Sequence, residues 1–205
     1  MKNIKIIAFD LQGTLSDSRF SDEFWMKLLP KLYSKSKGIS LEESHNELSV
    51  FFKKVGKYDK RYYSEGFWLK SLELDIDFEK LAGMLKNKPR FYADSTKLLK
   101  SLKNKKIILI SSTTKNFISV ELKDNKKYFS NIYSSIDDFN IAGKPPKIYE
   151  MICKKLAVLP EEMLYVGNDK EMDIDNAKAA GLQTFYFDKN VARKKLISKL
   201  KKALK

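Results

Sequence analysis

A carboxylate stands directly after the first apolar run of this chain, at the start of a turn that a phosphate could approach. The run is Ile4–Phe9, the carboxylate is Asp10, and the turn contains Gly13 and Thr14. An Asp at the carboxyl end of a parallel strand faces the crevice where open α/β sheets bind ligands, and a glycine gives the tight turn there. The pattern therefore favours Asp10 as a covalent nucleophile.

Three further polar clusters could complete a site for phosphoryl transfer. Ser111 ends a later apolar run, Lys144 stands before two prolines at the predicted start of a helix, and Asn168 opens an acidic stretch after another run. Phosphoryl transfer needs a nucleophile, fixed cations, hydrogen-bond donors and usually an acid or base. The clusters offer candidates for the cations and the donors.

Taken in order, the four clusters resemble the four motifs of the haloacid dehalogenase-like (HAD) superfamily, and the resemblance covers essentially the whole chain. The matching segments are Asp10-Leu11-Gln12-Gly13-Thr14 for motif one, Ser111 for motif two, Gly143 to Tyr149 for motif three, and Tyr165 to Ile174 for motif four. Any one motif would be a weak signal, whereas four in the right order are specific. The resemblance implies a hydrolase in which Asp10 becomes an aspartyl phosphate.

The resemblance also implies catalytic roles for other residues. Thr14 would orient Asp10, Ser111 would hold a phosphoryl oxygen, and Lys144 would neutralise the nucleophile and the phosphoryl charge. The spacing from this lysine to the next apolar-aromatic pair is one residue short of the family pattern, so Lys147 is the alternative to Lys144.

A bound Mg²⁺ follows from the same resemblance, since Mg²⁺ prefers hard oxygen ligands and needs only one or two protein carboxylates beside water and phosphate. The implied ligands are Asp10, the backbone carbonyl of Gln12, and Asp169. Asp173 would lie behind them. Asn168 stands where the family often has Asp, so the ligand could shift by one residue. The residues expected to contact the substrate are Gly13, Ser112 and Asn168.

Gln12 replaces the second Asp of motif one, which in family phosphatases protonates the leaving group and then activates water. A neutral amide does neither, so we expect a phosphatase slower by about 10²–10⁴-fold unless water or a residue of the insert substitutes. Two alternatives stay open. A metal-free dehalogenase could use Asp10 on a 2-haloacid, with Arg19, Arg61 or Arg90 as its arginine. A weakened member could also serve as a binding or regulatory protein.

Composition narrows the function classes. Cys153 and His45 are the only residues of their kinds among 205, which excludes a disulfide framework, a Cys/His zinc site and a histidine-based triad. The apolar runs are too short for a signal peptide or a membrane span, which favours a soluble cytoplasmic protein. The expected partner is a phosphorylated small-molecule substrate, and the expected state is a monomer or homodimer.

Half of the net charge of +14 comes from the C-terminal end, where Arg193–Lys205 holds seven basic residues and no acid. A polyanion such as nucleic acid could bind there. However, Leu196, Ile197, Leu200 and Leu204 fall at helical spacing, which favours a docked terminal helix. Nucleic acid is therefore not the expected partner, although the basic tail leaves it open.

Strands and helices are predicted to alternate on both sides of a helical insert. The strand runs are 4–9, 107–110, 131–134, 163–166 and 184–187, and the helical patterns between them are 92–103, 148–156 and 173–180. This alternation predicts an α/β fold with a doubly wound parallel sheet, Rossmann-like in its HAD form. The predicted helices of the insert are 20–35, 41–55, 63–72 and 78–85. The predicted domains are a core of residues 1–16 and 91–205 and an insert of residues 17–90, which resembles the C1 cap of the superfamily.

Overall fold

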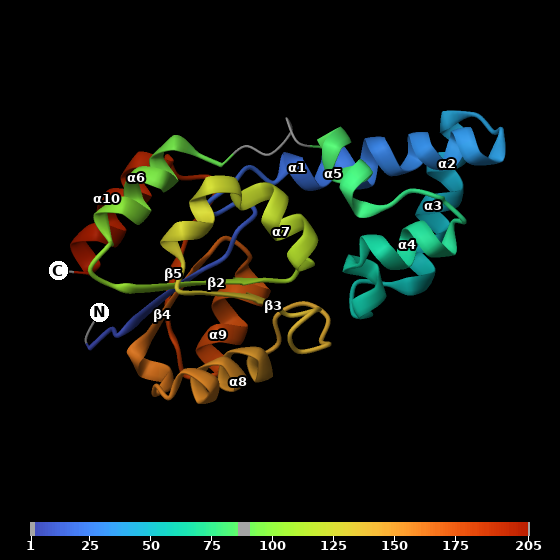
Figure 1. Cartoon of the computed structure of the whole chain (residues 1–205). Helices are drawn as coiled ribbons and strands as arrows, with labels where there is room; N and C mark the ends of the chain where they lie inside the picture. Colours follow the sequence, from blue (N-terminus) through green and yellow to red (C-terminus); the bar gives the residue numbers. More distant parts are fainter. Residues whose placement is uncertain (1–2, 86–90, 205) are drawn as a thin grey trace.

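The computed structural model describes residues 3–85 and 91–204. At its centre lies a five-stranded parallel sheet with the order β3-β2-β1-β4-β5, flanked by helices on both faces (Figure 1). The strands are β1 Ile6–Phe9, β2 Lys106–Ser111, β3 Asn131–Ser134, β4 Met163–Gly167 and β5 Gln183–Tyr186. The five predicted strands and the doubly wound α/β fold are therefore confirmed.

Strand β1 lies in the middle of the sheet because it pairs with β2 on one side and with β4 on the other. The chain adds β2 and β3 outward in one direction, and then returns to add β4 and β5 beyond the other edge of β1. The direction of winding thus reverses between β1 and β4. In open α/β sheets, ligands bind beyond the carboxyl ends of the strands at such a reversal.

Alternate residues of β1 point into two different cores. Ile7 and Phe9 belong to a cluster covered by α6, α7 and α10, whereas Ile6 and Ala8 belong to a cluster covered by α8 and α9 (Figure 1). A strand buried on both faces is apolar throughout, which is why the sequence pattern identified it. The core helices are α6 Ala93–Ser101, α7 Lys115–Leu122, α8 Pro146–Leu156, α9 Asn176–Ala179 and α10 Arg193–Ala203.

The helical insert lies beside the sheet and has a hydrophobic cluster of its own, which includes Phe24 and Trp68 (Figure 1). Helix α3 (Leu41–Val55) begins with a capping box, in which Ser40 Oγ accepts from the Glu43 N–H at 3.1 Å and the Glu43 carboxylate accepts from the Ser40 N–H at 2.8 Å. The elements of the insert are α1 Arg19–Asp22, a π-helical stretch Glu23–Leu28, α2 Leu29–Lys37, α3 Leu41–Val55, a 3₁₀ turn Lys60–Tyr63, α4 Glu65–Ser71 and α5 Phe78–Leu85.

Helix α7 is an element that the sequence patterns did not identify. Its Phe117 ring packs in the cluster of the insert, with its centroid 4.9 Å from that of Phe24. Ile118 and Leu122 of the same helix pack instead in the cluster on the sheet. One helix thus serves two cores, so its apolar residues do not form the single stripe that predicts an amphipathic helix.

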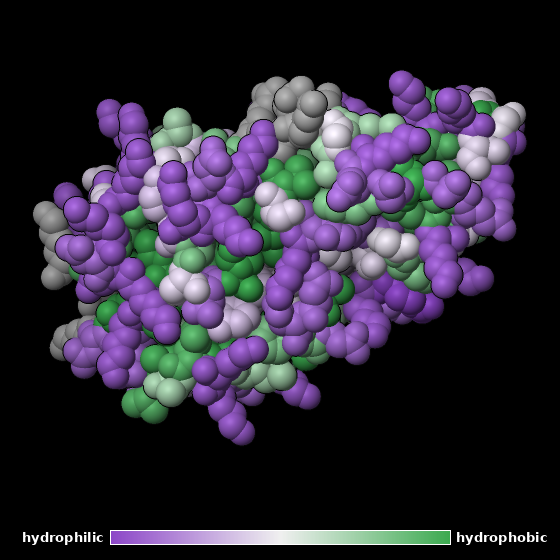
Figure 2. All heavy atoms as spheres, viewed as in Figure 1, coloured by the Kyte–Doolittle hydropathy of each residue, from purple (hydrophilic) through white to green (hydrophobic). Residues whose placement is uncertain are grey.

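The basic C-terminal segment forms a docked helix, as its spacing predicted. In α10, Leu196 and Leu200 are buried in the sheet cluster. Ile197 of the same helix and Leu204, just after it, are partly buried and pack against that cluster. Hydrophilic side chains cover most of the face of the molecule shown in Figure 2. Of the helices in the described ranges, none is long and apolar enough to cross a membrane.

Candidate active site

Asp10 lies at the winding reversal between β1 and β4. Its backbone N–H donates to the Val166 carbonyl at 2.9 Å, which holds the end of β1 against β4. The chain then turns at Gly13, whose φ is +80° and where a Cβ would lie 2.5 Å from the Asn168 side chain. Gly13 therefore allows Asn168 to approach the loop that carries Asp10.

A buried lysine joins Asp10 to Asp173. Lys144 Nζ lies 2.7 Å from Asp10 Oδ1 and 2.5 Å from Asp173 Oδ1, and it donates to the Tyr165 hydroxyl at 3.0 Å. Lys144 is 3% exposed and Asp173 is 1% exposed, so salt and water screen these charges little. Because one ammonium faces two carboxylates, the cluster carries a net negative charge when both acids are ionised.

The backbone explains why Lys144, and not Lys147, reaches Asp10. Two prolines follow Lys144 and fix the backbone at the start of α8. The Asn176 side-chain amide also donates to the Lys144 carbonyl at 3.1 Å. Lys147 lies one turn later and is exposed to solvent.

The surroundings of the cluster set the ionisation of both partners. Burial raises the pKa of Asp10, the Lys144 ammonium opposes this rise and the Asp173 carboxylate adds to it, so that the pKa is about 7. Burial alone would lower the pKa of Lys144, but Asp10 and Asp173 outweigh it and hold that pKa above its ordinary value. Lys144 is therefore a permanent cation, and the charge of Asp10 depends on pH near neutrality.

Asn168 lies over the Asp10 carboxylate and the backbone carbonyl of Gln12. The inward atom of its side-chain amide is 3.3 Å from Asp10 Oδ2, 2.8 Å from Gln12 O and 2.9 Å from Thr14 Oγ1. With its nitrogen inward, the amide can donate to these oxygens. With its oxygen inward, the Asn168 amide oxygen lies beside the Asp10 carboxylate and the Gln12 carbonyl oxygen, and all three are acceptors. Adjacent ligands of octahedral Mg²⁺ lie about 3 Å apart, since each Mg–O bond is about 2.1 Å. The oxygen-inward arrangement and the net negative charge beside it both fit this cation.

Asp169 and Asp173 shape the turn that presents Asn168. Asp169 Oδ1 accepts a backbone N–H three residues further on at 2.7 Å, which caps the next helical turn. Asp173 Oδ2 accepts from the backbone N–H groups of Asn168 and Asp169 at 2.9 Å each. The side chain of this turn that contacts Asp10 is therefore Asn168, one residue before the metal ligand that the sequence favoured.

The predicted serines lie one strand away from Asp10. Ser111 is the last residue of β2, which pairs directly with β1, and it is 4% exposed. Its Oγ accepts from the Thr113 N–H at 3.3 Å. Ser112 is the first residue of the loop after β2, and it lines a cavity.

The Gln12 side chain binds a buried acid that the sequence analysis did not single out. Gln12 Nε2 donates to Glu121 Oε1, and Ser16 Oγ donates to Glu121 Oε2 at 2.7 Å. Glu121 is 1% exposed, and burial raises its pKa to about 7. Glu121 follows Phe117 by four residues in α7, so a helix identified there would have placed this acid on an apolar face.

The span that carries these residues matches a known protein family. A model of the haloacid dehalogenase-like hydrolases matches residues 4–181. The chain belongs to this family. The resemblance that the four sequence motifs indicated is thereby confirmed.

Phosphatases are among the relatives of this HAD-like hydrolase. It is 25% identical over 200 residues to the glyceraldehyde 3-phosphate phosphatase of Pyrococcus furiosus, a match that covers 91% of the chain and 82% of the relative. It is 22% identical over 187 residues to the GMP/IMP nucleotidase of Escherichia coli, covering 89% and 82%. The solved HAD phosphatase of Thermococcus onnurineus has a TM-score of 0.81 and 26% identity over 98% of both chains. The HAD-hydrolase YfnB of Bacillus subtilis, solved bound to magnesium, shares the fold with a TM-score of 0.66 and 14% identity, covering 94% of this chain and 92% of its own.

A cavity of about 300 Å³ lies between the HAD core and the helical insert. Gln12, Ser112 and Thr113 line it from the core, and residues of the insert line the other side. Gln12 is two residues from Asp10, so the cavity opens beside the loop that carries Asp10.

Proposed function

We propose that this HAD-like hydrolase is a Mg²⁺-dependent phosphatase, which hydrolyses a small phosphorylated metabolite through an aspartyl phosphate on Asp10. The observation that carries the proposal is the buried contact of Lys144 with Asp10 at 2.7 Å and with Asp173 at 2.5 Å. A phosphoryl group bound at Asp10 brings negative charge, which this fixed cation can stabilise as the group is transferred. The relatives that act on glyceraldehyde 3-phosphate and on GMP or IMP support the same reaction class.

The proposed reaction has two steps. An Asp10 carboxylate oxygen bonds to phosphorus as the bond to the leaving oxygen breaks, and that oxygen takes a proton from solvent to leave as the alcohol. Water then attacks the acyl phosphate and gives a proton to solvent, which releases phosphate and restores the carboxylate. Ser111 would donate to a phosphoryl oxygen, and Lys144 would stay charged throughout. Asp10, the Gln12 carbonyl and the Asn168 amide oxygen would hold Mg²⁺, which when bound supplies further positive charge to the phosphoryl oxygens.

The contacts of Asn168 favour it over Asp169 as the third protein ligand. Asn168 contacts both other proposed ligands, whereas the Asp169 carboxylate accepts a backbone N–H of the next helical turn. An amide ligand carries no charge, so the proposed set holds Mg²⁺ with one fewer negative charge than a set with Asp would.

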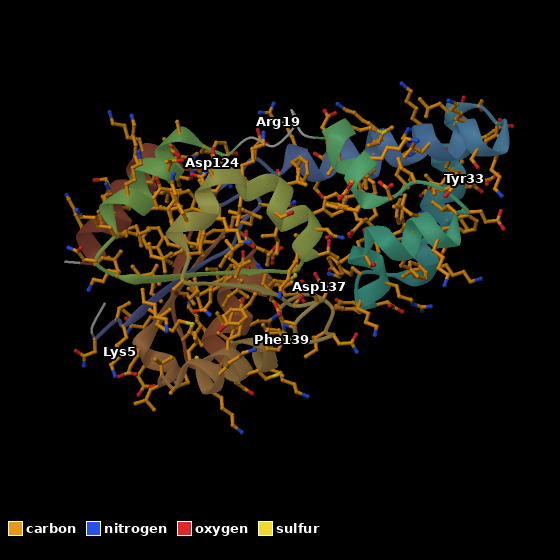
Figure 3. The ribbon with its side chains drawn as sticks, viewed as in Figure 1. Lys5, Arg19, Tyr33, Asp124, Asp137 and Phe139 are labelled. Atoms are coloured by element: carbon orange, nitrogen blue, oxygen red, sulfur yellow. The ribbon has the colours of Figure 1, made fainter. Side chains whose placement is uncertain are left out.

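The dehalogenase alternative gains no support from the arginines within the described ranges. Arg19 forms an ion pair with Asp17, and Arg61 forms one with Asp59 at 2.6 Å. Arg19 lies near the junction of insert and core, well away from Tyr33 at the far end of the insert (Figure 3). Arg90 lies outside the described residues.

A panel of phosphorylated metabolites, assayed with and without Mg²⁺, tests the proposed function. We expect Mg²⁺-dependent release of phosphate from at least one phosphomonoester and a phosphoenzyme that survives acid quenching. Asp10→Asn should abolish both signals. Asp175→Asn is the matched control, since Asp175 is an exposed acid that follows the motif-four segment and pairs with Lys170. Substantial activity of the Asp10 variant, or full turnover in EDTA, would overturn the proposal.

A further inference from the structure

The cavity beside the nucleophile loop has the size of a small-molecule site. Its volume of about 300 Å³ lies at the lower end of the range for such sites. The core wall is polar, with Gln12, Ser112 and Thr113, and the insert adds Ser21 and Asp22. A substrate whose phosphoryl group lies at Asp10 would place its leaving group in this cavity.

The described lining of the cavity lacks the excess of basic residues that the whole chain has. The chain contains 40 Lys and Arg residues against 26 Asp and Glu, yet no lysine or arginine lines the described wall of this cavity. Asp22 is the one acidic residue in that described lining. A second phosphate or a carboxylate on the substrate would meet no cation there and would be repelled by Asp22. The lining therefore favours an uncharged leaving group.

Aromatic rings form most of the apolar wall. The ring centroids of Trp25 and Phe52 lie 6.0 Å apart at an interplanar angle of 81°, and those of Phe52 and Tyr62 lie 6.0 Å apart at 63°. The ring centroids of Tyr62 and Tyr63 lie 5.2 Å apart at an interplanar angle of 70°. Trp25, Phe52, Tyr62 and Tyr63 are four aromatic residues of the described lining, and Met26 completes its apolar part. The wall therefore favours a planar ring, on which aromatic side chains can stack.

We infer that this cavity binds a planar, uncharged leaving group, and that the substrate is a nucleoside 5′-monophosphate. The inference rests on the proposed phosphatase function at Asp10. A nucleoside offers a flat base to Trp25 and Phe52, presents hydroxyl and N–H donors to Asp22, and carries no charge beyond its phosphate. A three-carbon phosphate offers no ring to this wall.

Substrate selectivity gives the first test. With Mg²⁺ present, kcat/KM is measured for adenosine and guanosine 5′-monophosphate, glycerol 3-phosphate, 3-phosphoglycerate and acetyl phosphate. We expect the nucleotides to exceed glycerol 3-phosphate by at least about tenfold through base stacking, and 3-phosphoglycerate to be the poorest because of its carboxylate. Equal or higher values for the three-carbon substrates would overturn the inference and leave the proposed function standing. Phosphate release from none of the five substrates would overturn the proposed function itself.

A charge reversal gives the second test. Asp22 is exposed, so Asp22→Lys changes the cavity wall without changing core packing. It should raise kcat/KM for 3-phosphoglycerate relative to the nucleotides by at least about tenfold. Glu23→Lys makes the same charge change on the next residue, outside the described lining, and should leave that ratio unchanged. Equal shifts in the two variants would overturn the inference, because the charge would then act from outside the cavity.

A ring deletion gives the third test. Trp25→Leu should lower kcat/KM for the nucleotides relative to acetyl phosphate by at least about tenfold. Phe51→Leu is the control, since Phe51 is next to Phe52 but lies outside the described lining. Trp25 also packs against Phe24, so circular dichroism of the variant is recorded beside the kinetics. A folded Trp25 variant that loses activity equally on all substrates would contradict the inference.

Discussion

The Arg193 guanidinium donates to the backbone carbonyl of Thr14 at 2.8 Å, so the first residue of α10 holds the loop that carries Asp10. The same group forms an ion pair with Asp94 at 2.9 Å, donates to Ser95 Oγ at 2.7 Å, and lies over the Tyr92 ring at 3.8 Å from its centroid. The basic segment thus has a structural role that needs no polyanion.

Removal of the Arg193 guanidinium should destabilise the loop that carries Asp10 and Thr14. Because hydrogen bonds from a charged donor contribute more than neutral ones, Arg193→Ala should lower the free energy of unfolding by about 2 kcal/mol. Lys194→Ala, at the next and exposed position, should stay within about 0.5 kcal/mol of the native protein. Urea denaturation measures both. Equal effects of the two substitutions would contradict the role assigned to Arg193.

Lys144→Ala should lower kcat/KM by at least about 10²-fold, since it removes the fixed cation from the transferring phosphoryl group. Lys147→Ala should have little effect, because that side chain is exposed on the first turn of α8. Steady-state kinetics on any accepted phosphomonoester decides between them. The opposite ranking would assign the catalytic lysine to position 147.

Asn168→Asp should tighten Mg²⁺ binding about tenfold, because a carboxylate adds charge beside Asp10 and the Gln12 carbonyl. The native amide must also turn its oxygen inward before it can bind the ion. Calorimetric titration of Mg²⁺ without substrate measures the affinity. Asp169→Asn should change it less. A larger loss from Asp169→Asn than gain from Asn168→Asp would restore Asp169 as the ligand.

Gln12→Asp should speed hydrolysis of the aspartyl phosphate by about 10²-fold, because a carboxylate can take a proton from the attacking water. The native enzyme should therefore release a burst of alcohol followed by a slow steady state. The new acid would lie near Glu121, so the gain should be larger in Gln12→Asp/Glu121→Gln, which keeps one carboxylic acid in the pair. Rapid-quench kinetics measures each step. Absence of both burst and gain would show that Gln12 does not limit turnover.

Glu121 should make the protein less stable as pH rises. Its pKa is about 7 in the folded protein against an ordinary 4.5, so between these values the unfolded chain loses a proton that the folded protein keeps. Stability therefore falls through this window, and the loss is complete above about pH 7. Relative to Glu121→Gln, the native protein should lose on the order of 3 kcal/mol. Urea unfolding of both proteins at several pH values measures the difference, and a constant difference would contradict the prediction.

Elements with a local cause could be predicted from the sequence. Strand β1 is apolar throughout because both of its faces are buried, and α3 begins where Ser40 and Glu43 can form a capping box. Residues at strand ends were also predictable as neighbours, since parallel strands end at one edge of the sheet. Asp10 directly follows β1 and Asp173 lies in the segment after β4, and both contact Lys144.

Features that depend on distant partners could not be predicted. Glu121 binds a side chain 109 positions away, and Arg193 binds a carbonyl 179 positions away, so neither pairing leaves a local pattern. No local sequence pattern indicates whether Asn168 or Asp169 contacts Asp10. It depends on a turn whose shape is set by the hydrogen bonds that the Asp173 carboxylate accepts.

The position of α7 between the two cores limits how the insert can swing away from the sheet. Phe117 of α7 packs among rings of the insert, and Glu65 of the insert accepts from Thr114 Oγ1 at 2.7 Å and from Asn116 Nδ2 at 2.8 Å, at the start of the same helix. If the insert moved as a rigid body about its two connections to the core, all of these contacts would have to break. Movement of the insert away from the sheet therefore either costs the free energy of these contacts or moves α7 together with the insert. In the second case the loop that contains Ser112, between β2 and α7, moves as well. Slow product release that depends on solvent viscosity is the expected kinetic consequence.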